Sequence, residues 1–119
     1  MQHKNVQSVR YALHGLKIAW QEELSFRIQV VAMMLALALG YFCEISSVEW
    51  LFLLLAIGVV LSAEVFNTAL EELCDKYKTD PDPHIGKIKD LAAAAVLITS
   101  FVAIIVGTKI FLPYLFPPL

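Results

Sequence analysis

Three long apolar segments constrain this chain more than any other feature of its sequence. They cover residues 28–45, 48–74 and 91–112. A helix that crosses a bilayer needs about 20 largely apolar residues to cover roughly 30 Å of hydrocarbon. Because backbone polar groups in a bilayer must be hydrogen-bonded internally, such segments fold as helices. The sequence therefore predicts an all-α membrane protein with three transmembrane helices.

The composition agrees with this class and excludes others. Of the 119 residues, 59% are hydrophobic and 17% charged, and the mean hydropathy is +0.70. An intrinsically disordered chain has the opposite balance. A nucleic-acid-binding protein needs a basic excess to neutralise phosphates, whereas nine Lys and Arg against eleven Asp and Glu give a net charge of -2. We expect a single membrane domain over residues 1–119 and no nucleic-acid partner.

The stretch before the first span, at about residues 5–26, mixes apolar and charged residues. Its apolar side chains recur at three- and four-residue spacing with charges between them. This pattern predicts an amphipathic helix that lies on the membrane surface. A soluble helix packed on a partner is the alternative. The charges also exclude a removable signal peptide.

The positive charges predict the orientation of the chain, since cytoplasmic flanks of spanning helices are enriched in Lys and Arg. Four of them precede the first span, four lie between the second and third, and the corner at 44–49 has none. We expect a cytoplasmic N-terminus and an extracytoplasmic C-terminus. Prolines 81 and 83 end the second helix before them, and we expect a charged connection over 74–89. The tail after residue 112 begins with Pro113.

The second span ends in a row of polar residues on one helical face. Glu64, Asn67, Thr68, Glu71 and Asp75 stand at i, i+3, i+4, i+7 and i+11. Ionisable groups at the edge of a bilayer are costly unless they are paired, hydrated or metal-bound, so this alignment predicts a functional site. A helix that simply leaves the membrane accounts for Asp75 but explains Glu64, between apolar neighbours, poorly.

Oxygen ligands on this face suit Mg2+, which typically binds through one or two carboxylates and substrate phosphates. A further carboxylate could come from Glu22 or Glu23, and the sequence holds no glycine-rich phosphate loop or kinase catalytic-loop motif. Positive charge for phosphates is available from Arg10, Arg27, Lys87 and Lys89. The residues alone thus indicate a metal-dependent site at the cytoplasmic interface, and phosphoryl transfer to a lipid hydroxyl is one use of it.

A small oligomeric transporter or channel subunit is the rival interpretation, in which a membrane-embedded Glu binds a cation or a proton. Coupled transport more naturally uses a carboxylate near the bilayer midplane. Glu64 and Glu71 instead stand at one end of their span.

The motifs resemble a known family. The string from Ala63 to Glu71, AEVFNTALE, is followed by Asp75, by the pair Lys89-Asp90 and by a run of small residues. These features resemble the bacterial integral-membrane diacylglycerol kinase and undecaprenol kinase family. Matches upstream extend the resemblance over nearly the whole chain, namely Gly15-Leu16-Lys17, Ala19-Trp20, Glu23 and Phe26-Arg27. The resemblance implies an ATP- and Mg2+-dependent lipid kinase of the bacterial inner membrane that assembles as a homotrimer with sites between neighbouring subunits.

The resemblance also implies roles for individual residues. Glu64 corresponds to the general base, and Asn67 would hold the base or the phosphate in register. Glu23 and Glu71 correspond to the metal-binding carboxylates. The nucleotide-binding candidates are Lys89, Asp90, Arg10 and Arg27. By the residues alone, Arg27 could instead be a snorkelling anchor, Lys89 and Asp90 a charge pair at a helix start, and Glu22 or Glu23 solvated.

The lipid acceptor stays open between the two branches of the family. Diacylglycerol-preferring relatives carry an acidic residue shortly after Phe-Arg, where this chain has Gln29. The run from Leu91 to Leu97 is also more similar to the undecaprenol branch. We therefore expect undecaprenol to be favoured, with diacylglycerol as the alternative.

Overall fold

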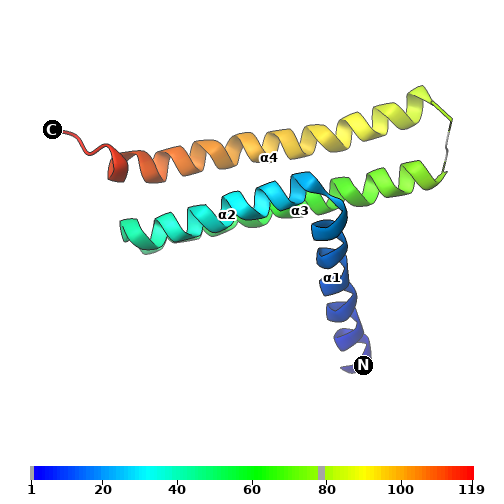
Figure 1. Cartoon of the computed structure of the whole chain (residues 1–119), viewed down its shortest axis with the longest axis horizontal. Coiled ribbons are helices and arrows are strands. Elements are labelled where there is room, and N and C mark those ends of the chain that lie inside the picture. Colours follow the sequence, from blue (N-terminus) through cyan, green and yellow to red (C-terminus); the bar gives the residue numbers. More distant parts are fainter. Residues whose placement is uncertain (1, 78–79) are drawn as a thin grey trace.

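Four α-helices make up the chain in a computed structural model that describes residues 2–77 and 80–119 (Figure 1). They are α1 (Gln2–Glu22), α2 (Leu24–Cys43), α3 (Ser47–Tyr77) and α4 (Pro83–Leu115). Helices α2, α3 and α4 are each long and apolar enough to cross a membrane. Within the described residues, the prediction of an all-helical chain with three candidate spans is confirmed.

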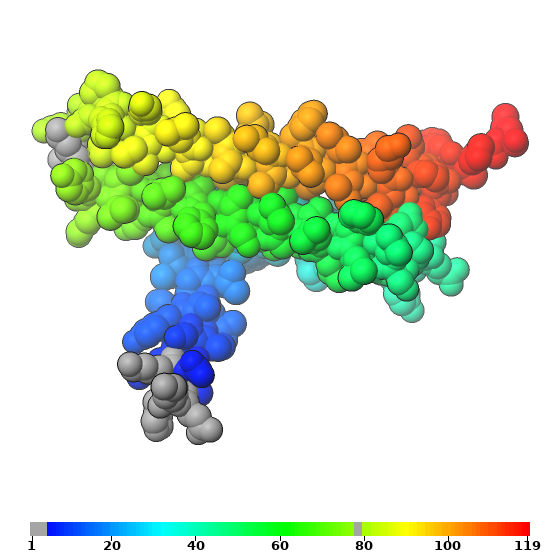
Figure 2. All heavy atoms as spheres, turned by 180° about the vertical axis from the view of Figure 1, so that it is seen from behind, coloured from blue at the N-terminus to red at the C-terminus, as the bar shows by residue number. Residues whose placement is uncertain are grey.

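Helices α2, α3 and α4 run along one direction, and α1 runs across it (Figure 1). The direction changes at Glu23, which has an extended backbone (φ -113°, ψ 109°) and precedes the first residue of α2. Seen from behind, α3 and α4 lie against each other along most of their length (Figure 2). The carboxyl end of α3 therefore lies beside the start of α4 and near the junction of α1 with α2, which brings three chain segments to one end of the molecule.

The tight corner between α2 and α3 lies at the opposite end of the molecule. Glu44 adopts a left-handed backbone conformation (φ 52°). Ser46 and Glu49 then form a reciprocal capping box: the Ser46 N–H donates to Glu49 Oε1 over 2.9 Å, and the Glu49 N–H donates to Ser46 Oγ over 3.2 Å. A small apolar cluster packs at this end, formed by Ile45, Leu53, Ile110 and Phe111.

The charged connection is shorter than the expected range 74–89, because helix α3 continues to Tyr77 and α4 already begins at Pro83. Asp82 caps α4 by accepting a hydrogen bond of 2.8 Å from the His84 N–H, and Pro83 suits the first turn, where its missing N–H costs nothing. At the other end, α4 extends to Leu115 with Pro113 inside it. The apolar segment is thus shorter than helix α4, since the helical backbone hydrogen bonds continue beyond the apolar residues at both ends.

Candidate active site

The polar face of α3 begins where that helix reaches the edge of a bilayer. About 20 apolar residues cover the hydrocarbon, and about 20 residues counted from Ser47, at the start of α3, end near Phe66. The last turns of α3 extend beyond that depth. Glu64 therefore lies near the level at which the polar group of a lipid meets the hydrocarbon.

Glu64 is the one charged side chain that is buried among the described residues, with 5% of its surface exposed. Its backbone carbonyl accepts a hydrogen bond of 2.9 Å from Thr68 Oγ1. The Thr68 hydroxyl therefore donates to the backbone of α3 and not to the Glu64 carboxylate. No hydrogen bond to the Glu64 carboxylate is found within residues 2–77 and 80–119. Asn67 Oδ1 is the one buried side-chain polar atom without a partner among the described residues, so the Glu64 carboxylate oxygens still reach the surface, where they can accept a hydrogen bond from a bound molecule.

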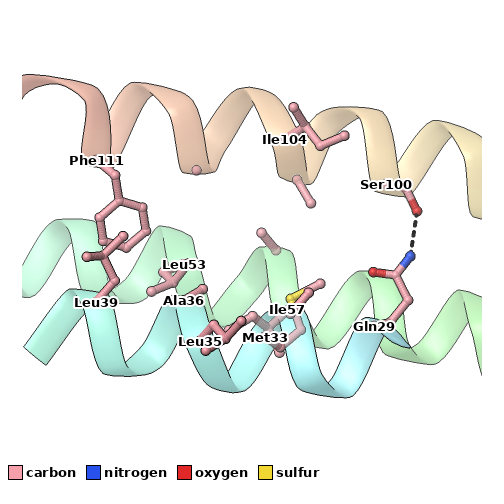
Figure 3. A pocket seen from close by; sticks show the side chains of 14 residues that line it. Gln29, Met33, Leu35, Ala36, Leu39, Leu53, Ile57, Ser100, Ile104 and Phe111 are labelled. Carbon is pink, nitrogen blue, oxygen red and sulfur yellow. Dashed lines mark hydrogen bonds between the residues drawn. The ribbon is translucent and has the colours of Figure 1, made fainter. Parts of the chain in front are cut away.

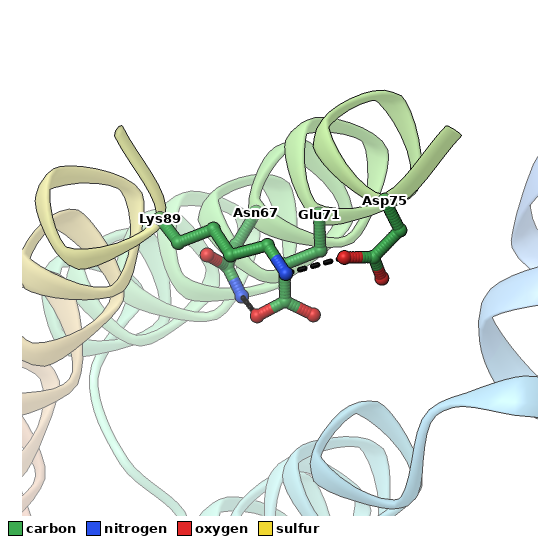
Figure 4. Close-up of polar contacts among 4 residues, drawn as sticks. All are labelled: Asn67, Glu71, Asp75 and Lys89. Carbon is green, nitrogen blue, oxygen red and sulfur yellow. Dashed lines mark hydrogen bonds and ion pairs between the residues drawn. The ribbon is translucent and has the colours of Figure 1, made fainter. Parts of the chain in front are cut away.

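Asn67 and Glu71 are joined one turn further along α3 (Figure 4). Asn67 Nδ2 donates to Glu71 Oε1 over 3.2 Å. The other polar atom of the amide, Asn67 Oδ1, is buried and has no hydrogen-bond partner among the described residues. Buried polar atoms are nearly always hydrogen-bonded, so this oxygen is a ready site for a donor or a cation.

Lys89 joins α4 to α3 by pairing with Asp75 (Figure 4). The Lys89 ammonium also lies within range of the Glu71 charge. Both partners are substantially exposed, with side-chain exposures of 37% for Lys89 and 64% for Asp75. An exposed ion pair stabilises a fold little, so this pair mainly places a positive charge beside the carboxylates. Asp90 follows on α4 and is exposed.

Glu23 brings a further carboxylate from the junction of α1 and α2. Its pKa is raised, first because burial disfavours the charged form and then because the charges of Glu71, Glu22, Glu64 and Glu72 repel it. The Glu23 side chain makes no capping hydrogen bond at the start of α2. The predicted metal ligands Glu23 and Glu71 thus come from different helices and feel each other's charge.

The donor set suits a divalent cation that also binds phosphate. Within the described ranges, no three His, Cys, Asp or Glu side chains are close enough to hold a metal ion by themselves. Mg2+ does not require such a cage, because it usually keeps several waters and takes one or two carboxylates besides substrate phosphates. Mutually repelling carboxylates at Glu23 and Glu71, with the unpaired oxygen of Asn67 nearby, fit that mode of binding.

The two arginines predicted to bind nucleotide, Arg10 and Arg27, are not part of the Asn67–Glu71 and Asp75–Lys89 contacts. Arg27 Nη1 donates to the backbone carbonyls of Trp20 (3.3 Å) and Gln21 (3.4 Å), so it caps the end of α1. Arg10 is exposed on α1, and the 13 residues between it and Glu23 correspond to about 20 Å of helix. The described chain therefore gathers Glu23, Glu64, Asn67, Glu71 and Lys89 without Arg10.

The sequence alone did not indicate that Asp75 pairs with Lys89. The two residues are 14 positions apart on different helices. The only available signal was the charge run on either side of the prolines, which gives opposite charges but not their alignment.

Comparison with known proteins identifies the family. The sequence profile described as prokaryotic diacylglycerol kinase matches residues 10–111. The chain belongs to this family. It is 30% identical over 100 residues to the diacylglycerol kinase of Escherichia coli (strain K12), covering 84% of this chain and 82% of that protein. It is 33% identical over 105 residues to the undecaprenol kinase of Bacillus subtilis (strain 168), covering 88% and 85%.

A diacylglycerol kinase of Helicobacter pylori (strain ATCC 700392 / 26695) is 34% identical over 88 residues, or 74% of this chain and 69% of that protein. Relatives with both kinds of name are thus similar to this chain to about the same degree. Family membership makes the chain a lipid kinase with membrane-spanning helices, and the gathered polar residues are candidates for its active site.

Proposed function

We propose that this kinase transfers the γ-phosphoryl group of ATP to the hydroxyl of a membrane lipid in a Mg2+-dependent reaction, with undecaprenol favoured over diacylglycerol. The observation that carries the proposal is the buried Glu64 side chain, whose carboxylate has no hydrogen-bond partner among the described residues, beside the repelling pair Glu23 and Glu71. Several carboxylates at a membrane edge, with Lys89 as the one cation placed beside them among the described site residues, suit a substrate that arrives with a divalent cation.

Glu64 is proposed as the general base. Its carboxylate accepts the proton of the lipid hydroxyl as the hydroxyl oxygen forms a bond to the γ-phosphorus. The bond from that phosphorus to the bridging oxygen of ATP breaks, ADP leaves, and the proton passes from Glu64 to water. Catalysis of this kind depends mainly on positioning and on neutralising charge.

The neighbouring residues would hold the phosphates in place. Glu23 and Glu71 would bind Mg2+, which neutralises phosphate charge when it is present. Asn67 keeps Glu71 oriented through its hydrogen bond and offers its free oxygen to a donor on the substrate. Lys89 would contact the polyphosphate and Asp90 would support it. Arg27 and Arg10 remain candidates for the outer phosphates, and Arg27 would have to leave its carbonyl partners to reach them.

The proposed placement in the membrane follows from the arrangement of the helices. If α2, α3 and α4 span the bilayer, the crosswise helix α1 lies parallel to its surface (Figure 1). The Lys and Arg distribution supports the proposal that α1 and the connection of α3 to α4 face the cytoplasmic side of the bacterial inner membrane. A homotrimer is proposed because the family resemblance implies one, and the apolar side chains that the single chain exposes can face either lipid or a neighbouring subunit.

The first experiment measures transfer of labelled phosphate from ATP and Mg2+ by the purified protein in mixed micelles. Undecaprenol and diacylglycerol are offered separately and in competition, and thin-layer chromatography separates the products. We expect ATP-dependent labelling of both, with more undecaprenyl phosphate. The variant Glu64→Gln should be inactive with both lipids while remaining folded.

Glu72→Gln is the matched control, because Glu72 stands on another face of the same helix and is exposed. It should keep its activity. Full activity of Glu64→Gln would remove Glu64 from the mechanism. No product with either lipid would overturn the proposed function.

A further inference from the structure

One polar contact lies inside the spanning part of the bundle, apart from the carboxylates. Gln29 Nε2 on α2 donates to Ser100 Oγ on α4 over 3.3 Å (Figure 3). Both side chains are partly buried. Polar side chains within spanning helices are rare and mark function by default.

The pair stands at one end of an apolar cavity of about 350 Å³ between α2, α3 and α4 (Figure 3). Leu39, Leu53 and Phe111 lie at the other end. Among the described residues that line the cavity, only Gln29 and Ser100 have polar side chains. The cavity therefore offers an apolar space for a hydrocarbon chain with two polar groups at one end.

The cavity and the proposed base share one face of α3. Leu53 and Ile57 line the cavity, and Glu64 follows them at i+11 and i+7, spacings that keep side chains on one side of a helix. Val60, between them, is fully buried. The cavity therefore lies on the side of α3 that carries the proposed base, with the buried Val60 between the two.

Gln29 and Glu64 also lie at nearly the same depth. Lys89 of α4 pairs with Asp75 of the antiparallel α3, so these two residues lie at one level. Ser100 is 11 residues beyond Lys89 on α4, and Glu64 is 11 residues before Asp75 on α3, each about 17 Å along its helix. Since Ser100 contacts Gln29 directly, polar groups from three helices stand at the level of the proposed base.

The bond to Ser100 orients the Gln29 amide. Its nitrogen is turned to Ser100, and its oxygen points toward the cavity (Figure 3). The wall next to the base therefore presents an acceptor. A lipid alcohol without ester groups presents only hydrocarbon to this wall, because its single hydroxyl proton goes to Glu64, whereas ester carbonyls are acceptors themselves and find no free donor there. An unmatched polar group in a dry site is costly.

Building on the proposed kinase function, we propose that the Gln29–Ser100 pair sets lipid specificity: it favours a single-chain polyprenol, with no ester groups next to its hydroxyl, over diacylglycerol. Without Ser100, the Gln29 amide is free to turn its N–H groups toward the cavity. Ester carbonyls then gain a donor, and the preference shifts toward diacylglycerol.

The test is the ratio of kcat/KM for a polyprenol to kcat/KM for diacylglycerol in mixed micelles. Ser100→Ala should lower this ratio about five- to tenfold, the effect of one hydrogen bond gained or lost in a buried site. Thr99→Val is the matched control, because the Thr99 hydroxyl donates to the carbonyl of Val96 on its own helix. Its ratio should equal that of the unsubstituted protein.

Ser100→Thr keeps a hydroxyl at this position and should restore the ratio, which keeps the test valid if Ser100→Ala folds poorly. Equal loss of both activities in Ser100→Ala, or an unchanged ratio, would mean that the pair only ties α2 to α4, and would overturn the specificity proposal alone. Absence of ATP-dependent product from the unsubstituted protein would instead overturn the proposed function and the specificity proposal together.

Discussion

Asn67 donates from Nδ2 to Oε1 of Glu71 over 3.2 Å, and its own Oδ1 is buried without a partner among the described residues. The hydrogen bond orients the amide and holds the Glu71 carboxylate toward it. Groups that orient a metal-binding carboxylate commonly influence metal affinity nearly as much as the ligand itself. Asn67 is therefore placed to act through Glu71 as well as on the substrate.

We expect Asn67→Leu to lower phosphotransfer about 10- to 100-fold, the usual effect of removing a group that orients a metal ligand. The loss should be accompanied by a higher Mg2+ concentration at half-maximal activity, because Glu71 is then free to rotate. A titration of activity with Mg2+ measures this shift. Thr68→Val is the control, since Thr68 donates to the backbone of its own helix. An unchanged Mg2+ dependence in Asn67→Leu would contradict the role of Asn67 in orienting Glu71.

The raised pKa of Glu23 predicts a pH-dependent stability. Burial and neighbouring negative charges disfavour its ionised form in the folded state. The group therefore costs no stability at a pH below its ordinary pKa, and the cost develops as the pH rises through the raised pKa of the folded state. In divalent-free buffer near neutral pH, Glu23→Gln should unfold at a higher temperature than the unsubstituted protein.

The difference between Glu23→Gln and the unsubstituted protein should vanish when the pH is lowered below the ordinary range of a glutamate. Mg2+ should stabilise the unsubstituted protein more than the variant, since a ligand that binds only the folded state raises its stability. Thermal unfolding followed by circular dichroism in micelles measures both effects. Asp80→Asn, in the loop away from this cluster, should show neither. If Glu23→Gln unfolded at a lower temperature than the unsubstituted protein at neutral pH, the proposed repulsion between Glu23 and its acidic neighbours would be contradicted.

The local part of the candidate site could be predicted from the sequence, and the contacts between helices could not. Helical spacing alone places Glu64, Asn67 and Glu71 on one face, and the Asn67–Glu71 bond follows from an i, i+4 spacing. The bond of Gln29 to Ser100 spans 71 positions. Such a contact depends on how three helices pack, and hydrophobic periodicity carries no information about the rotation of one helix against another.

The ends of the helices were also predicted less well than their apolar centres. The expected span at 91–112 marks where α4 is apolar, but the helix itself starts at Pro83, where Asp82 caps it. Asp82 and Pro83 have the residue types of a helix start, but they lie outside the apolar segment and were therefore predicted to belong to the connection. Helix α3 likewise continues beyond the expected segment 48–74, to Tyr77, although Asp75 was predicted to share the helical face of Glu64.

Lys89 is predicted to act on nucleotide more than on stability. Lys89→Gln should raise the KM for ATP about tenfold or more, because a hydrogen bond from a charged donor to phosphate is lost. Its thermal midpoint should change little, since the Asp75–Lys89 pair is exposed. Steady-state kinetics with varied ATP measures the effect.

A charge-swapped double variant, Asp75→Lys with Lys89→Asp, separates the two roles of this position. It keeps an ion pair between α3 and α4 but exchanges the positions of the charges. If Lys89 binds phosphate, the charge-swapped protein should have a KM for ATP as high as that of Lys89→Gln. Recovery of the original KM would mean that only the link between the helices matters.

Gly40, at the corner of α2 and α3, is predicted to control stability without affecting the chemistry. A Cβ atom at this position would lie 2.9 Å from Cη2 of Trp50 and 3.1 Å from Cδ1 of Ile45. The indole ring is held among neighbouring helices, so Gly40→Ala should lower the free energy of unfolding by about 1–3 kcal/mol, as overpacking usually does. Gly58→Ala is the matched control, because no atom lies within 4 Å of its added Cβ. Since Gly40 stands at the end opposite the carboxylates, the folded fraction of Gly40→Ala should keep its kcat/KM. A loss of kcat/KM in that fraction would show that packing at the corner is transmitted along α3 to Glu64.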